Sequence, residues 1–361
     1  MRETLKGLEL NELFYAEAVR PILDAHFPNL PHTAALIGWS SEVLGYDDLE
    51  STDHNWGPRL YLFLSEPDYE RYAQNISGVL SEKLPAEFRG YPTHFEIPEG
   101  GDHPVAARVE SSTLNHKVDI ETIKNFFGWY VGANPFDQPT VADWLTFQEH
   151  KLLGATSGRV YHDGLGELEP VRQKFSYYPD QIRLYMLACE WRHVAEEEAF
   201  VGRAGFVGDE LGSALIAARI VHSLMRICFM MERKYAPYAK WFGTAFSRLD
   251  CAGELSPMLR ETLLARDWRE REKHLSTAYE TVARLHNQLG ITQPLPERVS
   301  KHGRSYMIIH AERFGEAIWH TITDPEVKRL KFFGGSLNQF AAFDNDLSQP
   351  SLCKVFKFLY E

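Results

Sequence analysis

The chain has 361 residues, of which 44% are hydrophobic and 24% charged, and its formal net charge is −12. This length allows two domains with separate cores, and the composition is typical of a folded globular chain. The negative charge argues against general binding to a nucleic-acid backbone, because proteins that bind one present basic surfaces. No apolar run approaches the roughly 20 residues that span a bilayer, so we expect no membrane partner.

The N-terminal residues and the cysteines give an expectation about the compartment. Residues 1–7 are charged and lack the apolar core of a secretory signal. The four cysteines have neither the spacing of a zinc site nor that of a disulfide framework. We therefore expect a cytoplasmic protein with reduced cysteines. The oligomeric state stays open.

The N-terminal half predicts a mixture of helices and strands. Apolar residues recur at helical spacing over 8–25, and prolines follow. The next predicted elements are strands at 33–37 and 58–64, a helix at 67–83, and short strands near 93–97 and 105–110. Alternation over 117–121 predicts a strand that places Asp119 and Glu121 on one face. Helices at 121–131 and 140–153 and a strand at 160–164 complete this half.

The pattern of apolar and polar residues along the chain changes near residues 165–180. Long helical patterns dominate from there, the clearest over 180–201 and 210–234. The prediction is an α+β fold with two domains. Residues 1–170 form a mixed sheet with flanking helices, and residues 171–361 form an all-helical domain.

The stretch 38–64 carries the clearest functional pattern. Gly38, Ser40 and Ser41 follow an apolar strand, and Asp53 and Asn55 precede the next strand. The order is similar to that of the polymerase-β-like nucleotidyltransferases. This resemblance implies that N–H groups of the turn, at a helix N-terminus, hold the phosphates of a nucleotide. It also implies that carboxylates hold Mg²⁺ against those phosphates, although the amide of Asn55 replaces the second of them.

The third carboxylate of such a site would come from the strand at 117–121. Mg²⁺ usually takes one or two carboxylates together with phosphate oxygens. Asp53 with Asp119 or Glu121 would supply them from neighbouring strands, and the sequence does not choose between these two. In the alternative interpretation Asp53 caps a turn in which Thr52 and Asn55 also take part.

Two polar stripes follow the expected long helices. Glu190, His193 and Glu197 share one face of the first, and Arg219, His222, Arg226 and Arg233 recur on the second. Arginines offer paired donors to phosphate or carboxylate groups. Arg203, in a glycine-rich loop, and Lys240, beside Trp241, are further candidates for ligand contact. Alternatively, both stripes face solvent, or they pair with each other, either as surface salt bridges or as a buried ion pair around Arg226.

Several longer segments resemble the DUF4037 family, which is assigned to the nucleotidyltransferase-fold superfamily. They are 41–46 (SEVLGY), 51–59 (STDHNWGPR), 158–164 (GRVYHDG), 198–203 (EAFVGR), 208–213 (GDELGS) and 232–241 (ERKYAPYAKW). The resemblance spans most of the chain. The family pattern Asp-His-Asp stands here as Asp53-His54-Asn55, which puts two-metal catalysis in doubt.

Two functions are therefore expected as alternatives. The first is a Mg²⁺-dependent nucleotidyltransferase that moves a nucleoside monophosphate from a triphosphate, with ATP expected, to a hydroxyl of a small molecule, a protein or RNA. The second is a nucleotide-binding or regulatory protein that has lost turnover. The expected catalytic residues are Asp53, Asp119 and Glu197, the metal ligands Asp53, Asn55, Asp119 and Glu121, and the nucleotide contacts Gly38, Ser40, Ser41, Arg203, Arg226 and Lys240. Glu197 is the base by resemblance to antibiotic nucleotidyltransferases, in which a carboxylate of a helical domain can serve.

Overall fold

The chain divides into two compact units in the computed structural model. It describes residues 5–48, 50–52, 54–101, 103–109, 113–301, 306–331, 333–341 and 349–361. Unit 1 comprises residues 1–138 and 151–176, and unit 2 comprises residues 139–150 and 177–361. The division differs from the predicted boundary at 170/171 in two segments, because residues 171–176 group with unit 1 and the short segment 139–150 does not. That segment groups with unit 2, where the buried carboxylate of Glu149 pairs with Arg226.

A four-stranded mixed sheet organises unit 1, in the order β7-β2-β1-β8. Its strands are β1 (Thr33–Leu36), β2 (Arg59–Phe63), β7 (Lys117–Glu121) and β8 (Arg159–Asp163). β2 runs parallel to β7, and β1 is antiparallel to both β2 and β8. Ala35, Tyr61 and Asp119 are aligned across three strands, so their side chains share one face of the sheet.

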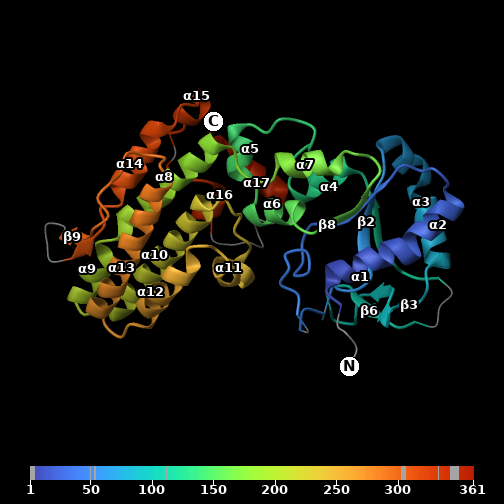
Figure 1. The fold of residues 1–361 in the computed structure, drawn as a ribbon, viewed down its shortest axis with the longest axis horizontal. Helices are drawn as coiled ribbons and strands as arrows, with labels where there is room; N and C mark the ends of the chain where they lie inside the picture. Colours follow the sequence, from blue (N-terminus) through green and yellow to red (C-terminus); the bar gives the residue numbers. More distant parts are fainter. Residues whose placement is uncertain are drawn as a thin grey trace. The chain divides into compact units, whose positions relative to one another are not determined.

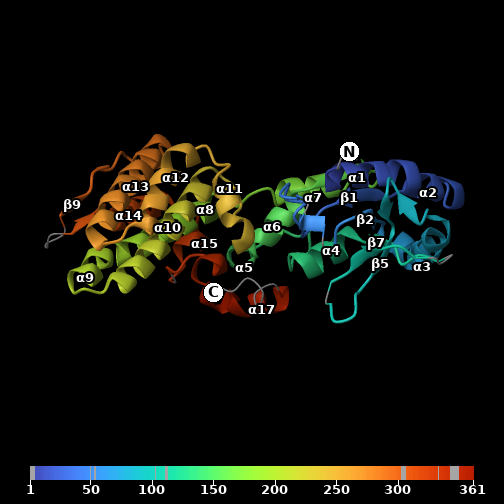
Figure 2. The same cartoon turned by 90° about the horizontal axis from the view of Figure 1, so that it is seen from below.

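The two faces of this sheet have different coverings. Leu62 and its neighbours on one face pack against α1 (Gly7–Phe14), α2 (Arg20–His26) and α3 (Glu66–Lys83) in a single apolar core. A π-helical turn at Tyr15–Val19 joins α1 to α2. On the other face Tyr61 and Phe63 contact Phe126 of α4 (Ile123–Tyr130). The strands thus lie between α1 and α4 (Figure 2).

Side-chain caps define where several helices of unit 1 begin. Ser65 accepts a hydrogen bond from the backbone N–H of Asp68 at the start of α3, and Thr122 does the same for Asn125 in α4. The remaining elements of unit 1 are short. They are β3 (Glu87–Phe88), β4 (Tyr91–Pro92), β5 (His94–Glu96), β6 (Val105–Ala107) and α7 (Leu168–Lys174), and α6 (Glu149–Thr156) spans the join between the units.

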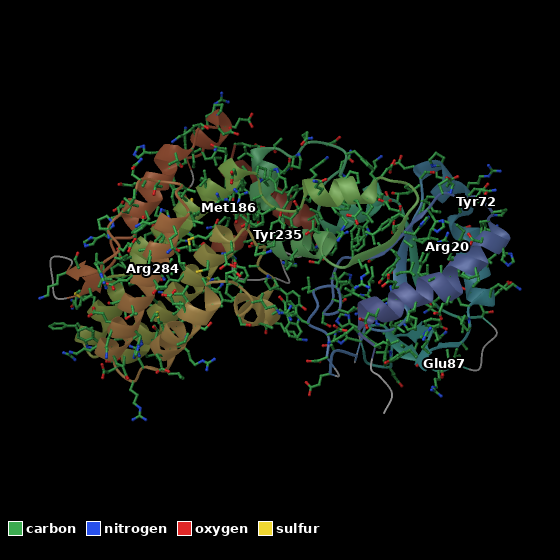
Figure 3. The ribbon with its side chains drawn as sticks, viewed as in Figure 1. Arg20, Tyr72, Glu87, Met186, Tyr235 and Arg284 are labelled. Carbon is green, nitrogen blue, oxygen red and sulfur yellow. The ribbon has the colours of Figure 1, made fainter. Side chains whose placement is uncertain are left out.

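Unit 2 is built on long helices that lie side by side (Figure 1). They are α8 (Asp180–Glu197), α10 (Glu210–Met231), α12 (Ala252–Leu264), α13 (Trp268–Gln288) and α14 (Glu312–Thr321), and the short helix α9 (Phe200–Phe206) packs against α10. Met186 of α8 is buried, and so is Tyr235, which follows α10 and packs against Tyr177 and Tyr178 (Figure 3). The shorter helices are α5 (Val141–Thr146), α11 (Ala239–Phe246), α15 (Pro325–Lys328), α16 (Leu337–Phe340) and α17 (Pro350–Val355).

The α+β class, the mixed sheet with flanking helices and the helical second part are confirmed, with two differences in detail. The helix predicted over 140–153 is two helices, α5 and α6, because Phe147 leaves the helical conformation with ψ 139°. Unit 2 also contains a short two-stranded ribbon, β9 (Ser300–Lys301) with β10 (Met307–Ile308).

One helix requires a correction to the expectation about apolar runs. Within the described residues, α10 is long and apolar enough to cross a membrane by length and composition, with a mean hydropathy of 1.6. However, 56% of that apolar window is buried inside the structure, where α10 packs against α8, α9, α12 and α13. The core helix of a globular unit has the same properties, so α10 is only weak evidence for a membrane span.

Candidate functional site

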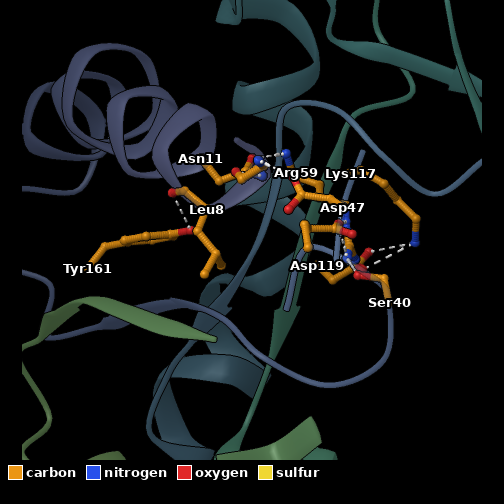
Figure 4. Close-up of polar contacts among 10 residues, drawn as sticks. Leu8, Asn11, Ser40, Asp47, Arg59, Lys117, Asp119 and Tyr161 are labelled. Atoms are coloured by element: carbon orange, nitrogen blue, oxygen red, sulfur yellow. Dashed lines mark hydrogen bonds and ion pairs between the residues drawn. The ribbon is translucent and has the colours of Figure 1, made fainter. Parts of the chain in front are cut away.

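A pair of carboxylates lies on one face of β7. Strand alternation turns Asp119 and Glu121 to the same side, next to Tyr61 and Phe63 of β2. The Asp119 side chain is 38% exposed, and Lys117 Nζ lies 3.2 Å from its Oδ2 (Figure 4). The structure therefore brings together the two residues between which the sequence did not choose.

The surroundings of Glu121 show how the two carboxylates influence each other. Burial raises the pKa of Glu121, and the nearby charge of Asp119 raises it further, whereas hydrogen bonds with Thr122 and Asn125 oppose the shift. A bound cation would remove this unfavourable interaction. Within the described parts of the chain, no group of three or more His, Cys, Asp or Glu side chains is placed to hold a metal ion. Asp53 lies outside the described residues.

The turn after β1 adopts a conformation that favours small residues. Gly38 has φ 98° and its N–H donates to the carbonyl of Gly154, while Ser40 has φ 141°. Ser41 begins an irregular turn, in which its carbonyl accepts from the N–H of Tyr46. The helix expected to begin at this turn is absent from the described residues 38–48, so any phosphate contact here would come from turn N–H groups without a helix dipole.

A buried ion pair fixes this turn to the sheet. Arg59, the first residue of β2, donates to Glu42 from Nε (3.0 Å) and from Nη2 (2.6 Å). Its Nη2 also donates to Ser40 Oγ at 2.7 Å (Figure 4). Burial disfavours the charged guanidinium, yet Glu42 outweighs it and raises the pKa of Arg59. This pair was not predicted from the sequence, although an arginine at the start of an otherwise apolar strand was a usable signal.

Aromatic rings surround the same turn. Trp39 is 46% exposed and hydrogen bonds with Tyr61, the residue aligned with Asp119. The ring of Trp39 lies 6.5 Å from that of His103, which stacks on His54 at 5.1 Å. These contacts connect His54, the chain neighbour of Asp53, to the turn and the carboxylate face. None of these aromatic residues was predicted to belong to the site.

Asn55, which stands where the pattern has a carboxylate, is buried and only 5% exposed. Its φ is 52° and its backbone N–H donates to the carbonyl of Pro104 at 2.8 Å. Its Nδ2 has no hydrogen-bond partner among the described residues. The side chain is thus enclosed, unlike the partly exposed carboxylate of Asp119.

The arginine and glutamate stripes of unit 2 meet in a buried cluster. Arg226 Nη2 donates to Glu149 Oε2 at 2.9 Å, and Arg226 Nε lies 3.6 Å from Glu190 Oε2. Glu149 Oε1 also accepts the backbone N–H of Ala236 at 2.9 Å. Arg226 therefore has carboxylate partners within unit 2, as in the buried-ion-pair interpretation of the stripe. Sequence analysis did not foresee that Glu149, from α6, is one of them.

The other predicted contacts of unit 2 lie at the surface. Arg219 pairs with Glu197 at 2.5 Å, with the Arg219 side chain 58% exposed. Arg233 pairs with Asp180 at 2.5 Å. Arg203 is exposed on α9, and Lys240 is exposed with its Nζ 4.9 Å from the centre of the Trp241 ring. The predicted role of Glu197 as a base stays a prediction, and so do the predicted ligand contacts of Arg203 and Lys240.

Residues 144–242 match the model of a domain of unknown function, DUF4037. The predicted resemblance to this family is confirmed. The match covers Glu149, Glu190 and Arg226 of the buried cluster, and it ends well before the C-terminus. The carboxylate face of β7 and the turn after β1 lie outside it.

Other comparisons add little. A crystal structure of a nucleotidyltransferase-like protein from Exiguobacterium sibiricum 255-15 is 9% identical, with a TM-score of 0.32 over 77% of each chain. A likeness at this TM-score carries no weight for the site. None of the curated proteins matches the chain.

Proposed function

We propose that unit 1 binds a nucleoside triphosphate with Mg²⁺ and that the protein is a nucleotidyltransferase, transferring a nucleoside monophosphate to a hydroxyl acceptor. The observation that carries this proposal is the face of the sheet on which Asp119 and Glu121 lie, where Tyr61, aligned with Asp119, hydrogen bonds with Trp39 of a positive-φ turn. Such turns present backbone N–H groups to phosphates, and paired carboxylates suit a cation that neutralises a triphosphate.

The residues present fit Mg²⁺. Asp119 and Glu121 offer hard oxygen ligands on one side of β7. Burial is the main cause of the raised pKa of Glu121, the charge of Asp119 adds to it, and a bound cation would favour the ionised carboxylate. Bound Mg²⁺ would neutralise the phosphates and favour in-line transfer. Asp119 would exchange Lys117 for the cation, and Arg59 would keep the turn in place by holding Ser40 and Glu42. Trp39, exposed beside the turn, is a surface on which a base would stack.

The first experiment measures thermal stabilisation by each of the four nucleoside triphosphates, with and without Mg²⁺. A ligand at about 100 times its Kd stabilises the folded state by roughly 2.7 kcal/mol. We expect such stabilisation to require Mg²⁺ and to be lost in Asp119→Asn and Asp53→Ala. Glu70→Gln, an exposed change on α3, is the control and should behave as wild type. Undiminished Mg²⁺-dependent stabilisation in Asp119→Asn would contradict the assigned site.

A second candidate is a nucleotide-binding protein without turnover, and Asn55 favours it. An amide brings no charge to a metal, and here it is enclosed. Pyrophosphate release in the presence of Mg²⁺ and the stabilising nucleotide separates the two functions. Asn55→Asp should raise turnover if the missing carboxylate limits an active enzyme. Nucleotide binding with no pyrophosphate release in either protein would favour the binding function.

A further inference from the structure

Unit 2 contains a groove that no part of the proposed function uses. It has a volume of about 650 Å³ and lies between α8, α10 and the segment 338–341. Its apolar lining comes from Leu215 and Ala218 of α10 and from Phe340, and all three elements also contribute polar side chains. Glu196 and Glu197 stand at its rim, where each already pairs with an arginine.

The floor of the groove holds a buried carboxylate. Glu190 is 1% exposed, and its Oε2 accepts a hydrogen bond from Gln339 Nε2 at 2.7 Å. Arg226 Nε lies 3.6 Å and His193 Nδ1 3.8 Å from its two oxygens. These contacts outweigh burial, which opposes ionisation, and hold the pKa of Glu190 below its usual value. Glu190 is therefore ionised at neutral pH.

The buried charges beneath the groove do not balance. Arg226 is shared between Glu149 and Glu190, so one guanidinium faces two buried carboxylates. The remaining cationic partner of Glu190 among the described residues is His193, whose side chain is partly exposed in the groove. Burial lowers the pKa of His193, but Glu190 outweighs it and raises that pKa overall. Protonation of His193, 3.8 Å from Glu190, adds the positive charge that the buried cluster lacks.

We propose that this groove binds a small organic molecule through a primary ammonium group placed against Glu190, with its apolar chain along Leu215, Ala218 and Phe340. The ammonium takes over the charge that protonated His193 otherwise supplies, so binding releases a proton from His193. The surplus buried charge distinguishes this site from an acidic surface, because the rim carboxylates are already paired. The proposal does not depend on nucleotide binding by unit 1.

Competition with a proton gives the site a defined pH dependence. Affinity for an ammonium should rise with pH as His193 loses its proton. An alkylammonium stays charged over this range, since its pKa is close to the roughly 10.4 of lysine. The other titratable or charged groups around His193 are Glu190, Glu196 and Glu197 on α8 and Arg219, His222 and Arg226 on α10, while Asn338 and Gln339 face it from the C-terminal segment.

The test titrates the full chain with n-butylammonium and with its neutral analogue n-butanol, following the imidazole signals of His193 by NMR. We expect saturable binding of the ammonium, tighter at higher pH, and a lowered pKa of His193 in the complex. Glu190→Gln should weaken binding about tenfold, the loss of one charged hydrogen bond. Glu196→Gln, at the rim, should change it less than about twofold, as for a screened surface charge.

A second variant, His193→Gln, controls for the possibility that Glu190→Gln weakens binding by altering the fold. His193→Gln removes the competing proton, and it should keep ammonium binding while losing the pH dependence. Absence of saturable n-butylammonium binding would overturn the proposal. Equal binding of n-butanol would overturn it as well, and so would equal weakening by Glu190→Gln and Glu196→Gln, because the groove would then be no more than an acidic surface.

Discussion

Each unit of this protein buries an arginine among carboxylates, but the two sites differ in how their charges balance. In unit 1, Arg59 forms an ion pair with one carboxylate among the described residues, Glu42, and it also donates to the hydroxyl of Ser40. In unit 2, Arg226 faces both Glu149 and Glu190. Both arginines are nine-tenths buried or more.

The difference indicates two uses of a buried arginine. A one-to-one pair has no charge left over, so its effect is geometric: it fixes the turn of residues 38–42 against β2. A cluster with one excess carboxylate needs a further cation, which makes it responsive to protonation or to a ligand. The first arrangement positions a candidate site, and the second is itself a candidate site.

The largest expected effect is that of removing Arg226. Arg226→Met leaves two buried carboxylates without their guanidinium, so we expect the free energy of unfolding to fall by about 3–5 kcal/mol. Urea unfolding followed by circular dichroism measures this loss without screening the charges. Adding Glu149→Gln should restore part of it. A loss below about 1 kcal/mol would show that the cluster is hydrated and not a buried network.

Removing Arg59 should have a somewhat smaller effect, because one buried carboxylate, Glu42, loses its partner among the described residues. We expect Arg59→Met to cost roughly 3 kcal/mol, and the double variant Arg59→Met with Glu42→Met to be close to wild type in stability. The double variant should nevertheless lose Mg²⁺-dependent nucleotide stabilisation, since the contacts of Arg59 that hold Ser40 and residue 42 against β2 are then absent. If it binds nucleotide normally, the pair is structural and does not position the site.

The third expected effect is a pH dependence of folding stability that arises from His193 in unit 2. The folded-state pKa of His193 is raised above its ordinary value of 6.5. Its stabilising contribution is therefore fully present below about pH 6.5 and is lost as pH rises through the folded-state pKa. Melting temperatures of the wild type and of His193→Gln, compared from about pH 5.5 to about pH 8.5, should converge as pH increases. A constant difference would exclude a role for the His193 proton.

Sequence patterns predicted the elements better than their long-range contacts. Alternation over 117–121 placed Asp119 and Glu121 on one face of a strand, because this depends only on local geometry. The partners of buried charges were harder to predict. Glu42 meets Arg59 across 17 positions, and Glu149 meets Arg226 across 77, and only the folded chain brings such pairs together.

The smallest expected effect comes from Arg219, which lies seven positions before Arg226 on α10. Two positions separated by seven residues drift only about 20° around a straight helix, so both arginines belong to the same stripe. Their surroundings differ, because the Arg219 side chain is 58% exposed and pairs with Glu197 at the surface. Arg219→Ala should therefore cost only about 0.2–1 kcal/mol in urea unfolding, and less at high salt. A loss as large as that of Arg226→Met would mean that exposure does not separate the two arginines and that the whole stripe acts as one network.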